Sequence, residues 1–231
     1  MSFVANYLLA GGVSILAGLD RTAAGQTLFS RPLVAASATG FLLDDFQTGM
    51  QVGILMELLW LGRLPVGASI PPDDTQIAVA GTGLAVIMGR WIGWGGLPMV
   101  LLSLLVSMPL GKVGQLFDRL ARKGNERLLD RAASALRAGR HDVLERFHLM
   151  GLFGFAMASL ATYLVIVSFG SLLVYQLAPV LMTRISSVLS GRGIESGLRA
   201  PSGLFQYASI FGQPHPWNDP EAGRRAQPAN A

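Results

Sequence analysis

The chain has 231 residues, of which 51% are hydrophobic and only 14% are charged, and its mean hydropathy is +0.46. Soluble domains average roughly 25% charged residues, so this composition predicts an integral membrane protein and argues against an ordinary soluble domain. The absence of cysteine excludes disulfides, iron–sulfur clusters and thiolate zinc sites.

Basic residues are concentrated in one part of the chain. Four precede position 111, nine lie between Lys112 and Arg146, none lies from Phe147 to Thr183, and five follow. Short loops rich in Lys and Arg stay in the cytoplasm, so residues 112–146 and the tail are both expected on the cytoplasmic side. The net charge of +4 then reflects topology, and nucleic-acid binding is not expected.

The first apolar run, from Phe3 to Leu19, is predicted to be a membrane segment. No Lys or Arg precedes it and no Ala-x-Ala pattern follows it, so a removable signal peptide is not expected. The side of the membrane on which the N-terminus lies is left open.

The next two apolar runs are short. The first begins at Pro32, which suits the first turn of a helix, and ends at Leu43; the second extends from Met50 to Leu61 and is broken at 62–65. Both are shorter than the roughly 20 residues that span a bilayer. We expect a re-entrant or broken-helix pair, which counts as zero or two crossings.

Carboxylates lie within this membrane-type stretch, at Asp44, Asp45 and Glu57. A charge near the bilayer centre costs at least about 2.5–3.5 kcal/mol, so it persists mainly where it faces protein, a partner or a watery cavity. Non-helical backbone at membrane depth is likewise tolerated only where it is buried in protein or lines a water-filled cavity. The stretch from Arg31 to Asp74 is therefore interpreted as a polar-solute site.

The segments Gln76 to Met88 and Ile92 to Leu110 are the next spanning candidates, in one crossing or two. The Gly89-Arg90-Trp91 sequence between them is typical of an interfacial turn. From Val113 onward, apolar residues at i, i+3, i+4 and i+7 predict an amphipathic helix. It is expected either flat on the cytoplasmic face, with basic side chains near anionic lipid, or packed on the protein as a solvated connector.

The uncharged segment Phe147 to Thr183 is too long for one crossing at about 1.5 Å per residue, so a hairpin turning near residues 168–171 is predicted. That hairpin would return the tail to the cytoplasmic side. The tail itself is rich in Gly, Pro, Ser and Arg and is expected to be partly disordered.

An ordered set of spaced residues resembles enzyme IIC, a membrane component of the mannose/fructose/sorbose class of the bacterial phosphotransferase system. The residues that carry the resemblance are Arg31-Pro32-Leu33, Gly40, Asp45, Thr48-Gly49, Gly53, Glu57, Leu61-Gly62, Val66-Gly67-Ala68 and Pro71-Pro72-Asp73. The resemblance covers residues 5 to 110 well and the amphipathic middle loosely.

The resemblance implies a sugar-translocating component in the bacterial inner membrane, working with a second membrane component, enzyme IID, and with the soluble components IIB and IIA. Sugar is carried inward in that family and phosphorylated as it is released, and the phosphohistidines belong to other components. No catalytic residue, cofactor or metal is therefore expected in this chain, and none of its three histidines receives a catalytic role. These are His141, His148 and His215.

The candidate sugar-binding residues are Glu57, Asp73 and Asp45, because a carboxylate accepts strong hydrogen bonds from neighbouring sugar hydroxyls. Each has a structural alternative. Glu57 can instead form an ion pair with Arg31 or Arg63, Asp73 can instead be the N-cap of the helix near Gln76, and Asp45 can cap or solvate a turn. Asp74 is expected to face solvent.

Other candidates are weaker. The indoles of Trp60, Trp91 and Trp94 are suited to stacking on a sugar, but tryptophan is common at membrane interfaces, so belt residues are the favoured interpretation. A metal site at the adjacent Asp44 and Asp45 lacks a third ligand.

The expected fold is an all-α, multi-pass integral membrane protein with broken or re-entrant helices in its N-terminal half. Its expected parts are a membrane domain at 1–110, a cytoplasmic amphipathic segment at 111–146, a membrane hairpin at 147–185 and a polar tail at 186–231.

The chain departs from the family pattern in two places. The family usually has Leu-Gly-Asp where this chain has Leu43-Asp44-Asp45, and it continues with further membrane segments after the part that matches residue 185. A shortened, non-transporting scaffold or regulatory component and an unrelated ion-coupled carrier therefore stay open as alternatives, as does a homo-oligomer.

Overall fold

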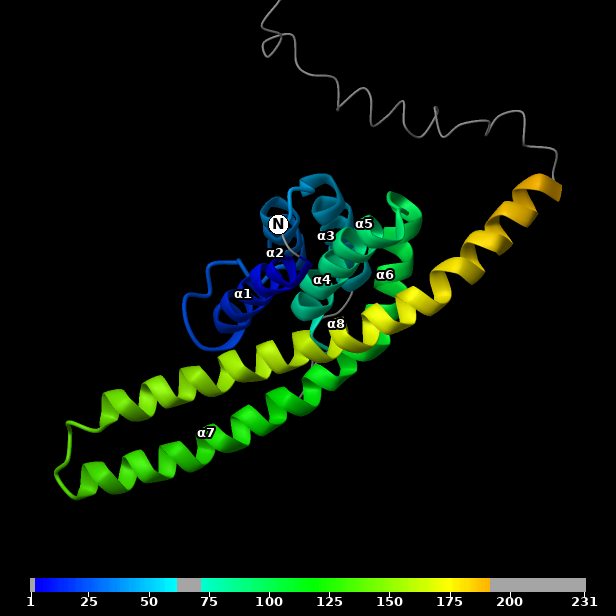
Figure 1. Ribbon diagram of the computed structural model, residues 1–231. Helices are drawn as coiled ribbons and strands as arrows, with labels where there is room; N and C mark the ends of the chain where they lie inside the picture. The colour runs from blue at the N-terminus through cyan, green and yellow to red at the C-terminus, as the bar shows by residue number, and fades with distance from the viewer. Residues whose placement is uncertain (1–2, 62–71, 192–231) are drawn as a thin grey trace, which may run out of the picture. The chain divides into compact units, whose positions relative to one another are not determined.

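The structure is a computed structural model that describes residues 3–61 and 72–191, with side chains described as far as Leu181 (Figure 1). The described residues form helices and connecting turns, without strands. They belong to two compact units, 1–179 and 180–231, and the first unit holds all the helices except the last part of the final one.

The elements are α1 (Phe3–Thr22), α2 (Pro32–Leu42), α3 (Phe46–Trp60), α4 (Asp74–Gly83), the π-helical segment η1 (Leu84–Met88), α5 (Gly89–Ile92), α6 (Leu97–Leu110), the 3₁₀ turn η2 (Gly111–Val113), α7 (Gly114–Arg137) and α8 (Leu144–Gly191).

One helical stretch lies at the centre of the first unit. Every residue from Thr75 to Gly89, through α4 and η1, is buried. Helices α1, α2, α3 and α6 pack around α4. A helix that is buried on all sides needs apolar or small residues all round, and this segment consists of Ala, Gly, Val, Ile, Leu, Met and Thr apart from Gln76.

Helices α2 and α3 form the short antiparallel pair that the sequence predicts. Glycines set their distance, because an added Cβ at Gly49 would lie 2.5 Å from the carbonyl oxygen of Ala36, and one at Gly40 would lie 2.7 Å from the Cα of Gly49. Gly53 similarly approaches the backbone of Leu33. Close backbone contact through small residues is the usual way in which helices associate in membranes.

The turn between α2 and α3 explains one departure from the family pattern. Asp44 has a φ of 55°, in the left-handed region that glycine occupies without a steric penalty. Aspartate is one of the few other residues that adopt this conformation. The position therefore requires a left-handed residue, which Asp44 supplies in place of the family's glycine.

The region from 74 to 110 forms two helical stretches joined by a turn, and whether they make one membrane crossing or two stays a prediction. The turn falls at Gly93 to Gly96, where both of these glycines have positive φ, rather than at the predicted Gly89-Arg90-Trp91. Arg90 and Trp91 belong to α5.

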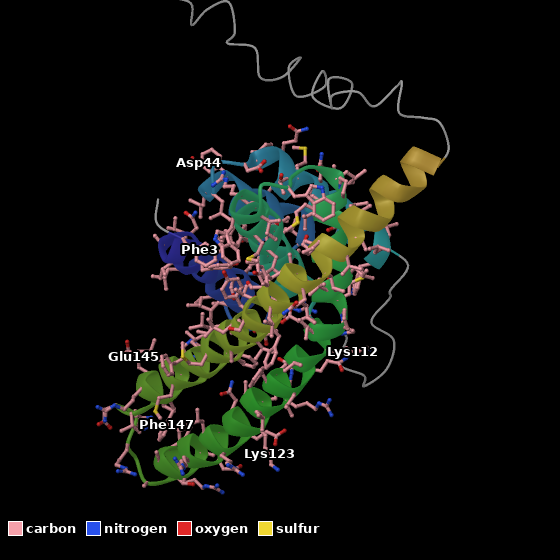
Figure 2. All side chains as sticks on the ribbon, turned by 45° about the vertical axis from the view of Figure 1, so that its right-hand side comes forward. Phe3, Asp44, Lys112, Lys123, Glu145 and Phe147 are labelled. Atoms are coloured by element: carbon pink, nitrogen blue, oxygen red, sulfur yellow. The ribbon has the colours of Figure 1, made fainter. Side chains whose placement is uncertain are left out.

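Helix α7 is amphipathic, as predicted, and packs on the first part of α8 (Figures 1 and 2). Leu128, Leu129 and Ala132 of α7 line one groove together with Phe147 and Leu152 of α8. Only Gly114 and Ala135 among the 24 residues of α7 are buried. This contact with α8 fits the connector packed on the protein, while the placement flat on the cytoplasmic face stays a prediction.

The predicted hairpin at 147–185 is wrong, because α8 is a single unbroken helix from Leu144 to Gly191. Gly170, which was expected in a turn, instead lets α8 approach η1, since an added Cβ would lie 2.6 Å from Leu84 Cδ1. Ser171 is hydrogen-bonded to the Tyr7 hydroxyl at 3.0 Å. The turn that was to return the tail to the cytoplasmic side is therefore absent from α8. The placement of the tail, which the basic residues predicted, stays a prediction, and residues 192–231 lie outside the described part.

The close approach of α2 and α3 gives a first prediction. Gly49→Ala should lower the free energy of unfolding by about 1–3 kcal/mol, the usual cost of overpacking, because the new methyl group meets backbone that cannot rotate away. Thermal or denaturant unfolding of the purified chain in detergent measures the change.

Gly12→Ala is the matched control. An added Cβ at Gly12 in α1 meets nothing within 4 Å, so this variant should be neutral or more stable by up to about 1 kcal/mol, from helix propensity alone. Equal stabilities for the two variants would contradict the packing described for α2 and α3.

Candidate functional site

Asp73 marks the start of the buried helix. Its Oδ1 accepts hydrogen bonds from the Gln76 backbone N–H at 3.1 Å and from Arg21 Nη1 at 2.9 Å. Arg21 also donates to Thr75 Oγ1 at 3.1 Å and forms an ion pair with Asp74. Burial raises the pKa of the Asp73 carboxyl, and the Arg21 guanidinium and the Gln76 N–H oppose that rise.

The N-cap alternative for Asp73 is therefore what the structure shows, although its side chain is still 19% exposed. The expectation that Asp74 faces solvent is wrong, because Asp74 pairs with Arg21. Arg21 was not foreseen as a partner, since nothing local in the sequence relates the end of α1 to the start of α4.

Asp73 and Arg21 line a cavity of about 200 Å³ at this end of the buried helix. Two glycines bring the surrounding helices together: an added Cβ at Gly18 would overlap Ser159 Oγ, and one at Gly114 would lie 3.0 Å from Asp73 Cβ. Polar side chains from three helices complete the lining, namely Thr22 of α1, Gln115, Asp118 and Arg122 of α7, and Ser159 and Thr162 of α8.

Behind the cavity, a buried polar contact fixes α1 on α4. Ser14 Oγ donates to Gln76 Oε1 at 2.7 Å, and Gln76 Nε2 donates to the Ser14 carbonyl oxygen at 3.0 Å. Both side chains are fully buried. Gln76 was expected only to start a helix, yet an amide at the head of an apolar run is a signal of such a contact.

Asp20 is a carboxylate for which the sequence analysis predicted no role. It accepts hydrogen bonds from the backbone N–H and hydroxyl of Thr27, at 2.6 and 2.8 Å, and from the Ser30 N–H at 2.9 Å. These contacts order the chain between α1 and α2. Asp20 therefore has a structural role in positioning the start of α2.

Glu57 forms an ion pair with Arg31, and its second oxygen accepts a hydrogen bond from the Leu33 N–H at 3.4 Å. The first ion-pair alternative is therefore present, whereas Arg63 lies outside the described residues. Glu57 does not line the cavity at Asp73. The Thr75 hydroxyl donates to the Ser30 carbonyl at 2.6 Å, so the start of α2, and with it Glu57, lies at the same end of the helices as Asp73.

Asp45 lies at the other end of α3. It is the N-cap of that helix, accepting from the Thr48 N–H at 3.0 Å and from the Thr48 hydroxyl at 2.8 Å. Twelve residues separate Asp45 from Glu57, which is about 18 Å along a helix. The three predicted ligands therefore do not converge on one point.

Trp91 has the environment of a belt residue. It is 62% exposed and packs on the rings of Phe3 and Tyr175, with centroid distances of 6.1 and 5.4 Å. Such an aromatic cluster is typical of the membrane–water interface. It marks the end of the unit at which Asp45 lies, since Arg90 beside Trp91 donates to the Leu43 and Asp44 carbonyls.

Comparison with known proteins identifies the family. A family model described as the PTS system sorbose-specific IIC component matches residues 4–194. The chain therefore belongs to this family of phosphotransferase-system IIC membrane components, which confirms the resemblance, the all-α membrane fold and the location in the bacterial inner membrane. Among the described residues, three helices are long and apolar enough to cross a membrane: Phe3–Thr22, Leu97–Arg137 and Leu144–Leu181.

The chain is similar to the mannose-specific EIIC component of Escherichia coli K12, at 28% identity over 129 residues, which are 56% of this chain and 46% of that protein. It is 30% identical over 128 residues to the fructose permease IIC component of Bacillus subtilis, covering 55% of this chain and 44% of that protein. The matched part thus spans less than half the length of these relatives.

Solved structures support the fold. A chain in the cryoEM structure of the mannose transporter ManYZ with microcin E492 aligns with a TM-score of 0.57 at 19% identity, covering 94% of this chain and 98% of that one. A second structure, described as a membrane protein, aligns with a TM-score of 0.58 at 20% identity, with 92% and 87% covered. At these identities the likeness concerns the fold alone.

The Arg21 contacts give a second prediction. Arg21→Met leaves Asp73 and Asp74 without their cation. Removing one partner of a fully buried ion pair costs about 3–5 kcal/mol, and because solvent reaches part of this pair we expect a loss of about 2–3 kcal/mol at neutral pH. Denaturant unfolding in detergent measures it. The loss should shrink as pH falls through the raised pKa of Asp73, since a protonated carboxyl needs no cation.

The control combines Arg21→Met with Asp73→Asn and Asp74→Asn. Asparagine keeps the N-cap but carries no charge, so the triple variant should recover most of the lost stability and the pH dependence should disappear. A triple variant as unstable as Arg21→Met would show that the ion pairs are not the cause.

Proposed function

We propose that this chain is the sugar-translocating IIC component of a phosphoenolpyruvate-dependent phosphotransferase system of the mannose/fructose/sorbose class. Its family and the sugar permeases among its relatives support this proposal. The structural observation that carries it is the polar cavity at the start of the buried helix, bounded by Asp73 and Arg21.

The chemistry of this cavity suits a neutral sugar. Asp73 accepts hydrogen bonds, and Arg21 and Arg122 donate them, so neighbouring hydroxyl groups find both acceptors and donors there. Charges of both signs line the cavity, which disfavours a strongly ionised ligand. A volume of about 200 Å³ suits one small solute and is below the range of drug-sized pockets.

Glu57 is proposed as a second sugar ligand at the same end of the helices. The Glu57 side chain is 19% exposed, whereas that of its partner Arg31 is 60% exposed. The guanidinium can therefore move away into solvent, while the carboxylate stays mostly shielded. A sugar hydroxyl that displaces the guanidinium would meet an oriented carboxylate. Asp45, at the opposite end, would contact sugar at a different stage of passage.

The cavity at Asp73 is proposed to open towards the cytoplasm. Gln115 and Arg122 of α7 line it, and α7 belongs to the segment that carries nine of the 18 basic residues. Sugar released at this end would emerge beside the α7–α8 pair, where the soluble component IIB could phosphorylate it. The histidines of this chain take no part in that transfer.

A second membrane component, enzyme IID, is proposed as the partner that completes the translocation path. Large apolar side chains of α2 and α3 remain exposed in the single chain, and lipid or a membrane partner would cover them. Among them are Phe41, Met50, Ile54 and Leu58. The soluble components IIB and IIA would supply the phosphoryl group.

The alternative is a non-transporting scaffold that docks soluble components. The exposed side of α7 favours it, since only two of the 24 residues of this helix are buried and its exposed charged residues could contact another protein. Genes for the IID, IIB and IIA components beside this one, together with sugar uptake, would favour transport. Binding of component IIB without uptake would favour the scaffold, and uptake without phosphorylation of the product would indicate an ion-coupled carrier.

The proposed ligands give a third prediction. In cells that express the full set of components, Glu57→Gln and Asp73→Asn should each abolish uptake of labelled mannose, fructose or sorbose, because each removes a charged acceptor from a hydroxyl group. Asparagine retains the N-cap at position 73, so the chain should still be inserted at normal levels.

Arg31→Gln is the matched control for Glu57. It breaks the same ion pair but leaves the carboxylate in place, so uptake should fall less than in Glu57→Gln. Equal losses in the two variants would assign Glu57 to the ion pair alone. Unchanged uptake in Glu57→Gln would remove it from the site.

A further inference from the structure

A second polar cavity lies at the other end of the buried helix. Its volume is about 280 Å³, and it shares no lining residue with the cavity at Asp73. Asp45 and Thr48 of α3 form one wall, and Arg90 of α5 and Trp94 of the following turn form another. The remaining lining is small or apolar: Ala85, Val86, Gly89, Gly93, Gly95 and Gly96.

The turn that carries Trp94 is held firmly against the buried helix. The Trp94 N–H donates to the Gly89 carbonyl oxygen at 2.9 Å. An added Cβ at Gly89 would lie 2.8 Å from the Trp94 carbonyl oxygen, so only glycine permits this approach. Gly93 and Gly96 supply the positive φ angles, 74° and 77°, that the turn requires. Trp94 is thus positioned by backbone contacts.

Arg90 holds the wall formed by Asp45 and Thr48 in place. Its Nη2 donates to the Leu43 carbonyl at 2.6 Å and to the Asp44 carbonyl at 3.1 Å, which ties the α2–α3 turn to α5. A guanidinium has five N–H groups, and these two bonds employ one nitrogen. The side chain therefore retains donors at the cavity while its position is set.

Asp45 keeps acceptor capacity in the same way. Thr48 gives one hydrogen bond to each of its two carboxylate oxygens. An ionised carboxylate has about four acceptor positions, so about two are left for a ligand. An oriented acceptor, an oriented donor and Trp94 thus line one small cavity.

We infer that this cavity is a second sugar-binding site, distinct from the one at Asp73. The inference rests on the proposed function for the class of ligand. Asp45 and Arg90 balance each other in charge, which favours a neutral ligand, and an indole at Trp94 would offer an apolar surface for the C–H face of a hexose. The buried helix from Thr75 to Gly89 separates the two sites by about 21 Å, so one monosaccharide cannot contact both.

The site lies at the end of the unit opposite α7, beside the aromatic cluster of Phe3, Trp91 and Tyr175. With α7 in the cytoplasm, this is the outer interface of the membrane. The site would therefore receive sugar before it enters the translocation path.

Tryptophan fluorescence tests the inference. The full-length chain in detergent is titrated with D-mannose, D-fructose and L-sorbose, and the emission of Trp94 is obtained as the difference between the wild-type chain and Trp94→Phe. At least one of these sugars should change that difference in a saturable way. Asp45→Asn, which keeps the N-cap of α3, and Arg90→Gln should each raise the half-saturating concentration about tenfold or more.

Asp73→Asn is the matched variant at the other end, and it should leave the half-saturating concentration for Trp94 within about twofold, as expected for distant sites. A Trp94 signal that none of the three sugars changes, up to the concentration that saturates uptake, would overturn the inference. So would an equal loss in Asp73→Asn. A Trp94 response in a chain that supports no uptake would leave the second site standing and refute the proposed transport function.

Discussion

The complete burial of the helix from Thr75 to Gly89 is the constraint on which the rest of the structure depends. A helix inside a membrane protein satisfies its own backbone along its length but not at its ends, where four N–H and four C=O groups lack helical partners. Asp73 and Arg21 lie at the first end, and the Gly93–Gly96 turn and Arg90 at the second. The cavities at Asp73 and at Asp45 lie at these two ends, where polar side chains meet the ends of the buried helix.

Close helix contacts make this burial attainable. Gly18, Gly40, Gly49 and Gly170 each occupy a position where a Cβ would overlap a neighbouring helix. In lipid the hydrophobic effect does not drive helices together, so van der Waals contact between backbones has to stabilise the association. The glycines that resemble helix breakers in the sequence are in these places packing residues.

This double meaning of glycine shows what the sequence could and could not predict. The short α2–α3 pair followed from Pro32 and run length, and the amphipathic α7 followed from periodicity, because both are local properties. Gly170 was wrongly predicted to lie in a turn, because only the position of Leu84 on η1 shows that it serves close packing. The Arg21 contact with Asp73 was also beyond reach, since 52 residues separate the two.

The carboxylates show how a structural role and a binding role are compatible in one residue. Asp45 and Asp73 are both N-caps, so each carboxyl group is oriented by hydrogen bonds to its own helix without any ligand. At the two proposed sites, a sugar hydroxyl would share an acceptor that already has partners, which would limit the affinity of each site. Moderate affinity is what translocation requires, because a solute that is bound must also be released. An N-cap aspartate at the edge of a cavity therefore suits a transporter better than an unpaired buried carboxylate, which would bind more tightly but would cost far more to hold ionised in the membrane.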